Sequence, residues 1–248
     1  MLLRLCLLLL MTWCTAAQAE RLTVYAEDTL PFAYISNDKV TAPVSEFVRT
    51  LVTRAGYEPD IRLSSWTGII RRSESGQTVI FYPVARTPER ENKYLWIGSL
   101  VQHHSYNLYK NKNRSDISLR TVDDAKGFRI GAIEGDVRER YLLSLGFKTD
   151  DKTGLIHVVN NKEGMRLLQL GRIDLLPLSA STFESQCKPD CQNFELALPL
   201  NLNTSLELTA NMATSPETVR RLRQAYQELL KDGTYARMLG NDTVIDSR

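Results

Sequence analysis

The chain has 248 residues, of which 43% are hydrophobic and 24% are charged, and its 31 basic and 29 acidic residues leave a formal net charge of +2. Such an even balance lacks the strongly basic surface of a protein that binds the nucleic-acid backbone, so we expect no nucleic-acid partner. The length suffices for two modest domains, and the sequence contains no internal repeat and no low-complexity tract.

The N-terminal segment has the pattern of a secretory signal peptide. Arg4 precedes a leucine-rich run, and the segment ends in the small-x-small sequence Ala17-Gln18-Ala19. The apolar run is too short to cross a bilayer, and Cys14 follows a tryptophan where a lipid-modified cysteine would need a small residue. We therefore expect export, cleavage after Ala19 and a periplasmic mature chain, residues 20–248, without a second long apolar run.

The first hundred residues predict the order strand, helix, strand, helix, strand. Apolar residues recur at helical spacing in the first helix, and Gly56 is a stop signal for it. In chain order, the predicted segments are 22–26, 43–56, 57–63, 66–72 and 78–84. This alternation is typical of a parallel sheet with helices on both faces.

A second unit begins near residue 108 and has the same order. In chain order, its predicted strands and helices are 128–133, 137–146, 155–159, 161–171 and 172–178. The chain then returns as a strand over 202–212 and ends in a long amphipathic helix over 215–233. Ser215 is a good N-cap for this helix, and Pro216 suits its first position.

Two α/β units of this kind place a cleft between them, and ligands bind outside the carboxyl ends of the strands. The loops that follow the predicted strands are 27–32, 64–68, 83–90, 133–137 and 177–181. Two arginines, Arg86 and Arg90, lie in the third of these loops, directly after an apolar strand. Loops in such positions often carry function, so this cationic segment is a candidate ligand contact.

An ordered set of motifs resembles a known family. The motifs are LTVYAEDTLPFAY (22–34), RAGYEP (54–59), SSWTGIIRRSESGQ (64–77), ARTPEREN (85–92), TVDDAKGFRIGAIEGD (121–136), LLQLGRIDLLPLS (167–179) and LLKDGTYARML (229–239). In this order they resemble the bacterial extracellular solute-binding proteins of family 3, periplasmic proteins that bind polar amino acids. The resemblance covers nearly all of the mature chain.

The resemblance implies an α/β protein with the two-lobed type II periplasmic-binding fold, each lobe a mostly parallel sheet flanked by helices. The first lobe would comprise residues 20–107 and 205–248, and the second residues 108–204. Two hinge strands, near 105–110 and 199–204, would join the lobes, which would close on a ligand. We expect a monomer that works with a membrane permease or a sensor.

Arg90 matches the arginine of the family's T-x-x-R motif. The resemblance implies that this arginine clamps a ligand carboxylate, because a guanidinium can donate two parallel hydrogen bonds to it. The alternative is a surface arginine that pairs with Glu89 or Glu91. Arg86 is either a second anion contact or one half of an ion pair at the edge of the cleft.

Three other residues are candidate ligand contacts by resemblance. Trp66 takes the place of an aromatic residue that packs on the ligand side chain, with ordinary core packing as the alternative. Phe32 belongs to a Pro-Phe pair that either contacts the ligand or shapes the loop after the first strand. Asp136 either caps the helix that starts at 137 or pairs with a ligand amine.

Two positions depart from the family's pattern. Ser179 stands where amino-acid binders place an aspartate for the ligand's ammonium group, and Thr78 stands where a first-lobe motif has an acid. Either Glu27, Asp28 or Asp136 replaces the missing acid, or the ligand is not a standard α-amino acid. Because ARTPEREN also supplies two arginines, we expect a site more cationic than that of a standard amino-acid binder and a more anionic ligand.

Cys187 and Cys191, in the sequence CKPDC, are the cysteines of the mature chain. Their close spacing in an exported protein favours a local disulfide. His103, His104 and His157 are not spaced as metal ligands to these cysteines, and redox pairs favour the C-x-x-C spacing. We therefore expect a structural disulfide, no metal and no cofactor.

Three functions remain open. The first is a periplasmic solute-binding protein that captures a small carboxylate-bearing polar solute for an ABC-type importer or a sensor. The second is an exported enzyme on the same scaffold, such as a cyclohexadienyl dehydratase-like lyase, which would need a positioned acid and base. Glu27, Asp28, Asp136 and His157 show no such arrangement in their spacing, and nucleophile motifs are absent, so we expect a non-enzyme. The third is an interaction protein that kept the fold and lost the ligand.

Overall fold

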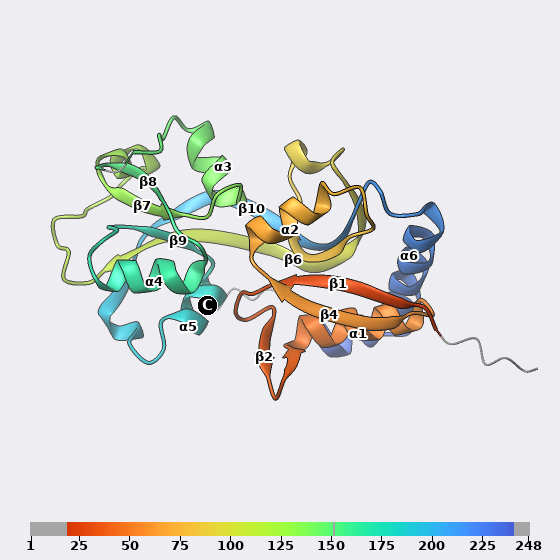
Figure 1. Cartoon of the computed structure of the whole chain (residues 1–248). Coiled ribbons are helices and arrows are strands. Elements are labelled where there is room, and N and C mark those ends of the chain that lie inside the picture. The colour runs from red at the N-terminus through yellow and green to blue at the C-terminus, as the bar shows by residue number, and fades with distance from the viewer. Residues whose placement is uncertain (1–18, 151, 241–248) are drawn as a thin grey trace, which may run out of the picture.

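The computed structural model describes residues 19–150 and 152–240, and Figure 1 shows two α/β lobes joined by a pair of long strands. The predicted signal peptide lies outside the described residues, apart from Ala19. Within the described ranges, no helix is both long enough and apolar enough to cross a membrane.

The first lobe is built on parallel strands. β1 (Arg21–Glu27) pairs in parallel with β4 (Glu58–Ser64) on one side and with β5 (Ile80–Ala85) on the other. Every residue of β5 is buried, as expected for a strand covered on both faces. α2 (Trp66–Ser73) follows β4 directly, so its first turn lies at the carboxyl edge of this sheet.

Three helices pack on one another against the first lobe's sheet. They are α1 (Pro43–Arg54), α6 (Pro216–Lys231) and α7 (Thr234–Leu239). Phe47 of α1 is fully buried, and its ring meets Tyr226 of α6 and Tyr235 of α7 edge to face, with centroid distances of 6.3 and 5.3 Å. The C-terminal helices are thereby attached to the N-terminal part of the chain.

Two strands of 18 residues each run from the first lobe into the second (Figure 1). β6 (Tyr94–Asn111) and β10 (Phe194–Asn211) pair antiparallel over nearly their whole length. β10 also pairs with β5, so the six-stranded sheet has the order β4-β1-β5-β10-β6-β9. The segments expected as hinges, 105–110 and 199–204, lie opposite each other in this pair, where its register shifts.

The second lobe has its own parallel pair, β7 (Arg129–Ala132) and β8 (Gly154–His157). β9 (Leu176–Leu178) pairs antiparallel with β6 and so connects this lobe to the long strands. The helices of the second lobe are α3 (Val137–Ser144), α4 (Asn161–Gln169) and α5 (Ala180–Gln186).

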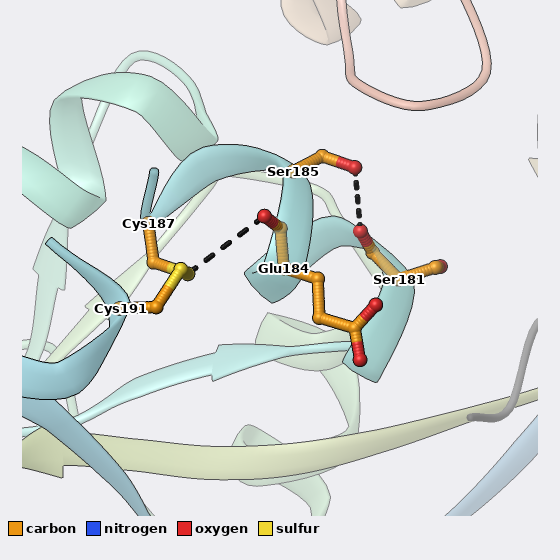
Figure 2. Close-up of a disulfide and its surroundings, with 5 residues drawn as sticks. All are labelled: Ser181, Glu184, Ser185, Cys187 and Cys191. Carbon is orange, nitrogen blue, oxygen red and sulfur yellow. Dashed lines mark hydrogen bonds between the residues drawn. A yellow bond between two sulfur atoms is a disulfide. The ribbon is translucent and has the colours of Figure 1, made fainter. Parts of the chain in front are cut away.

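The disulfide predicted between Cys187 and Cys191 is present and closes a short loop directly after α5 (Figure 2). On the same helix, the ring of Phe183 stacks on Tyr109 of β6 with a centroid distance of 3.9 Å. The stacked rings hold α5 against β6, and the disulfide ties the end of α5 to the segment just before β10.

The predicted alternation of strands and helices is confirmed, with bounds that differ by a few residues, except that the strand predicted over 202–212 is β10 and already begins at Phe194. The predictions missed α5, α7, most of β6 and a hairpin formed by β2 (Tyr34–Ser36) and β3 (Lys39–Thr41). The hairpin turn places Asn37 and Asp38 at φ of 50° and 57°, a left-handed conformation that Asn and Asp tolerate better than most residues.

Candidate ligand-binding site

A small cavity lies between the lobes, at the carboxyl ends of β1 and β5. Its volume is about 40 Å³, which is room for about three water molecules. Among the residues that line it are the predicted contacts Phe32, Trp66, Arg90, Asp136 and Ser179. Side chains from both lobes therefore converge on one space, as in a site that closes around a ligand.

Arg90 extends across the gap between the lobes. It ends the 3₁₀ turn η2 (Pro88–Arg90), directly after β5. Its Nη1 donates to the Ala85 carbonyl at 3.1 Å, and its Nη2 donates to the Gly135 carbonyl of the second lobe at 2.9 Å. Among the described residues no acid pairs with this guanidinium, so its hydrogen bonds go to carbonyl oxygens, which a ligand carboxylate can replace.

Trp66 forms the wall beside that guanidinium. It is the first residue of α2, whose N-cap Ser65 accepts a hydrogen bond from the Gly68 N–H. The guanidinium carbon of Arg90 lies 4.8 Å from the centroid of the indole ring, a cation–π contact. Trp66 is 4% exposed, and within the described part of the chain its Nε1 has no hydrogen-bond partner. The ring therefore packs in the core and lines the cavity at once.

Asp136 is the N-cap of α3, the structural alternative considered for it. Its Oδ1 accepts from the backbone N–H of Arg138 at 2.8 Å and from Arg138 Nε at 2.6 Å. Burial favours the neutral acid, but the charge and hydrogen bonds of Arg138, with the charge of Arg90, hold the pKa of Asp136 below its usual value. Asp136 is therefore an anion already paired by the chain itself.

Glu27, at the end of β1, is the other acid in the cavity. Burial and then the nearby charge of Asp136 raise its pKa from 4.5 to about 7, and Arg138 and Arg90 offset this only in part. Its carboxyl therefore changes charge near neutral pH. Of the acids suggested as replacements for the missing aspartate, Glu27 and Asp136 face the cavity.

Ser179 places a hydroxyl at the cavity where an aspartate was expected from the family's pattern. It is the N-cap of α5 and accepts a hydrogen bond from the Thr182 N–H at 3.2 Å.

Phe32 packs edge to face on His104 with a centroid distance of 5.5 Å. Burial, followed by the charge of Arg138, lowers the pKa of His104 to about 3, so this imidazole is neutral.

Two predicted contacts lie elsewhere. Arg86 is exposed, and its Nε and Nη2 donate to the carboxylate of Glu91 at 2.9 and 2.5 Å, with Trp96 beneath the guanidinium. It lines an outer groove of about 980 Å³ between α2 and α3, which Trp66 and Arg90 line as well, and it does not reach the small cavity. Asp28 is exposed and its side chain does not line the cavity.

Sequence reasoning missed Arg138, Asn161 and Thr29. Arg138 Nη1 donates to Asn161 Oδ1, and Asn161 Nδ2 donates to Thr29 Oγ1 in the first lobe, each at 2.9 Å. The second bond crosses from lobe to lobe, as the Arg90 bond to Gly135 does. Arg138 has a local partner in Asp136, but no local pattern marks the bonds that tie Arg138 to Asn161 and Asn161 to Thr29, because these form only after distant segments come together.

Two α/β lobes with a charged cavity between them are the architecture expected of a protein that closes on a small ligand. The chain belongs to the bacterial extracellular solute-binding proteins, family 3, whose model matches residues 22–240. That membership confirms the predicted family and, with the structure, the fold class.

Comparison with known proteins supports the same class. The chain is 26% identical over 137 residues to the arginine-binding extracellular protein ArtP of Bacillus subtilis, a match that spans about half of each chain: 53% of this one and 52% of ArtP. Among solved structures, a histidine kinase sensor domain with similarity to periplasmic binding proteins has a TM-score of 0.78 at 15% identity, covering 89% of this chain and 95% of the other. An ancestral arginine-binding protein bound to arginine has a TM-score of 0.73 at 18% identity, covering 88% and 96%. These structural likenesses show the fold.

Proposed function

We propose that the chain is a periplasmic receptor that captures a small carboxylate-bearing polar solute, an amino acid or a related compound, between its lobes. The observation that carries this proposal is Arg90, a guanidinium at the cavity wall whose hydrogen bonds go to the carbonyls of Ala85 and Gly135 and to no acid of the described chain. A ligand carboxylate between the lobes would take the place of these two neutral carbonyl acceptors. The guanidinium would then donate two parallel, charge-assisted hydrogen bonds to the carboxylate.

The family and the relatives support the class of ligand. Family 3 consists of solute-binding proteins, and ArtP is described as arginine-binding. We propose that this chain, like its family, serves either an ABC-type importer or a sensor, and the similarity to a sensor domain supports the second possibility. The mature protein is proposed to be a monomer that acts after removal of the signal peptide.

We also propose how the lobes divide the chain. Residues 20–107 and 205–248 form the first lobe, residues 108–204 form the second, and hinges lie near 105–110 and 199–204. The pairing of β6 with β10 across both lobes supports this division, because bending that one ladder would open the cavity.

Titration calorimetry with a panel of amino acids and small organic acids tests the role of Arg90. Arg90→Ala should weaken binding of the best ligand by about 100-fold or more, because each of the two charge-assisted hydrogen bonds contributes about 1.5–3 kcal/mol. Arg86→Ala is the matched control from the same loop and should change affinity by less than about threefold, since its partner is Glu91. Equal affinities of wild type and Arg90→Ala would contradict the proposal.

One observation favours the enzyme alternative, namely Glu27 with a pKa of about 7 inside the cavity. Such a group can act as an acid or a base at neutral pH. We keep receptor function as the proposal because the family consists of binding proteins. Incubation of each bound compound with the protein, followed by NMR spectroscopy, separates the two, and turnover would favour the enzyme.

A further inference from the structure

Arg138 is a second guanidinium in the cavity, and the proposed capture of a carboxylate by Arg90 does not require it. It lies in the first turn of α3 and is 7% exposed. Its Nε donates to Asp136 at 2.6 Å, and its Nη1 donates to Asn161 Oδ1 and to the Pro177 carbonyl, both at 2.9 Å. The partners belong to separate segments of the second lobe, so the guanidinium is held in one position.

The same side chain reaches the strands that form the back of the cavity. Its guanidinium carbon lies 5.8 Å from the ring centroid of Tyr106 in β6. Arg138 thereby fills space between α3 and β6, and the cavity beside it has a volume of only about 40 Å³. Any amino acid is larger than this space, so binding would hold the lobes further apart than they are here, and a long side chain would in addition have to displace Arg138.

The charges around the cavity also disfavour a ligand with a cationic side chain. Arg90 and Arg138 are cations, Asp136 is an anion engaged by Arg138, and Glu27 is a carboxyl group whose pKa burial raises to about 7. The set therefore has no surplus of negative charge to receive another cation. A ligand with a cationic side chain would have to compete with Arg138 for the same two acids in a poorly solvated space, where like charges repel strongly.

We propose that Arg138 is a specificity-determining residue. It supplies, from within the chain, the cation that a basic amino acid would bring, and it thereby reserves the cavity for acidic or neutral amino acids and similar small carboxylates. This inference rests on the proposed capture of a carboxylate and names the class of ligand more narrowly.

Titration calorimetry of wild type, Arg138→Gln and Arg140→Gln with L-glutamate, L-glutamine and L-arginine tests the inference. Wild type should bind glutamate or glutamine at least about tenfold more tightly than arginine. Arg138→Gln should reduce that preference by about tenfold or more. Arg140 lies on the same helix but is exposed and lines the outer groove, so Arg140→Gln should keep the wild-type ranking.

Tightest binding of arginine by wild type, or a ratio of affinities that is unchanged in Arg138→Gln, would overturn the role of Arg138 and leave the receptor function standing. Failure of every folded variant to bind any compound in the wider panel of amino acids and small organic acids would contradict both. The double variant Asp136→Asn/Arg138→Gln guards against misfolding, because it removes both members of a buried ion pair together. The double variant should also reduce the preference for glutamate or glutamine over arginine. The reduction should be smaller than in Arg138→Gln, because the double variant also lacks Asp136, an acid that could pair with the cationic side chain of arginine.

Discussion

Arg86, Arg90 and Arg138 show which parts of a site can be predicted from sequence. The loop after a buried strand and the T-x-x-R spacing mark Arg90, and the structure places it at the cavity. Both Arg86 and Arg90 lie close to Glu91 in the sequence, so the sequence could not decide which of them forms the ion pair. In the structure, the η2 turn places the Glu91 carboxylate beside Arg86. The place of Arg138 at the cavity could not be predicted, since, apart from Asp136, its partners Asn161 and Pro177 lie 23 and 39 residues away.

The buried carboxyl group of Glu27 should make the free energy of unfolding depend on pH. Its carboxyl has a folded-state pKa of about 7 against 4.5 as the ordinary value, so between these pH values the folded state holds the extra proton. The free energy of unfolding should therefore fall as the pH rises through this window. Glu27→Gln removes the effect and should be more stable than wild type by about 1–3 kcal/mol at pH 8, with a smaller difference at pH 5.

Urea unfolding at pH 5 and pH 8 measures this difference. Asp28→Asn, one residue further along and exposed, is the control and should change stability by a similar, small amount at both pH values. Parallel pH profiles for wild type and Glu27→Gln would show that Glu27 ionises normally in the folded protein.

At the scale of elements, helices with a regular apolar face and clear end signals were predicted well. α6 begins at the expected N-cap Ser215, whose side chain accepts from the Thr218 N–H. β6 was missed in large part because its burial does not alternate along the strand but changes as it passes from one lobe to the other. Periodicity within a short window cannot detect a strand whose neighbours change along its length.

The N-cap of α6 offers a direct test of one such element. Ser215→Ala should lower the free energy of unfolding by about 1 kcal/mol, because the Thr218 N–H loses its acceptor. Ser144→Ala removes an exposed hydroxyl near the end of α3 that donates to the Tyr141 carbonyl, and it should cost less than about 0.5 kcal/mol. Equal effects in urea denaturation would show that the cap does not stabilise α6.

At the scale of the whole molecule, direct hydrogen bonds join the lobes. Arg90 donates to Gly135, and Asn161 donates to Thr29, across the cavity. The order of strands and helices predicts two units but carries no information about how far apart they stand. That distance depends on side chains that meet only when the lobes are already close.

Asn161→Ala should therefore shift the unliganded protein towards an open form. Loss of one buried hydrogen bond, worth about 0.5–1.5 kcal/mol, would change the ratio of open to closed molecules by about 2- to 13-fold. Small-angle X-ray scattering should show a larger radius of gyration than in wild type, and a saturating ligand should restore the wild-type value. An unchanged radius without ligand would show that this bond does not control closure.

The capture of a small carboxylate at Arg90 is tested most directly by mass spectrometry of the compounds that co-purify with the native protein. Wild type should carry a small carboxylate without a cationic side chain, and Arg90→Ala purified in parallel should have lost it. A bound compound that lacks a carboxyl group, or one retained in equal amount by Arg90→Ala, would contradict the proposed function.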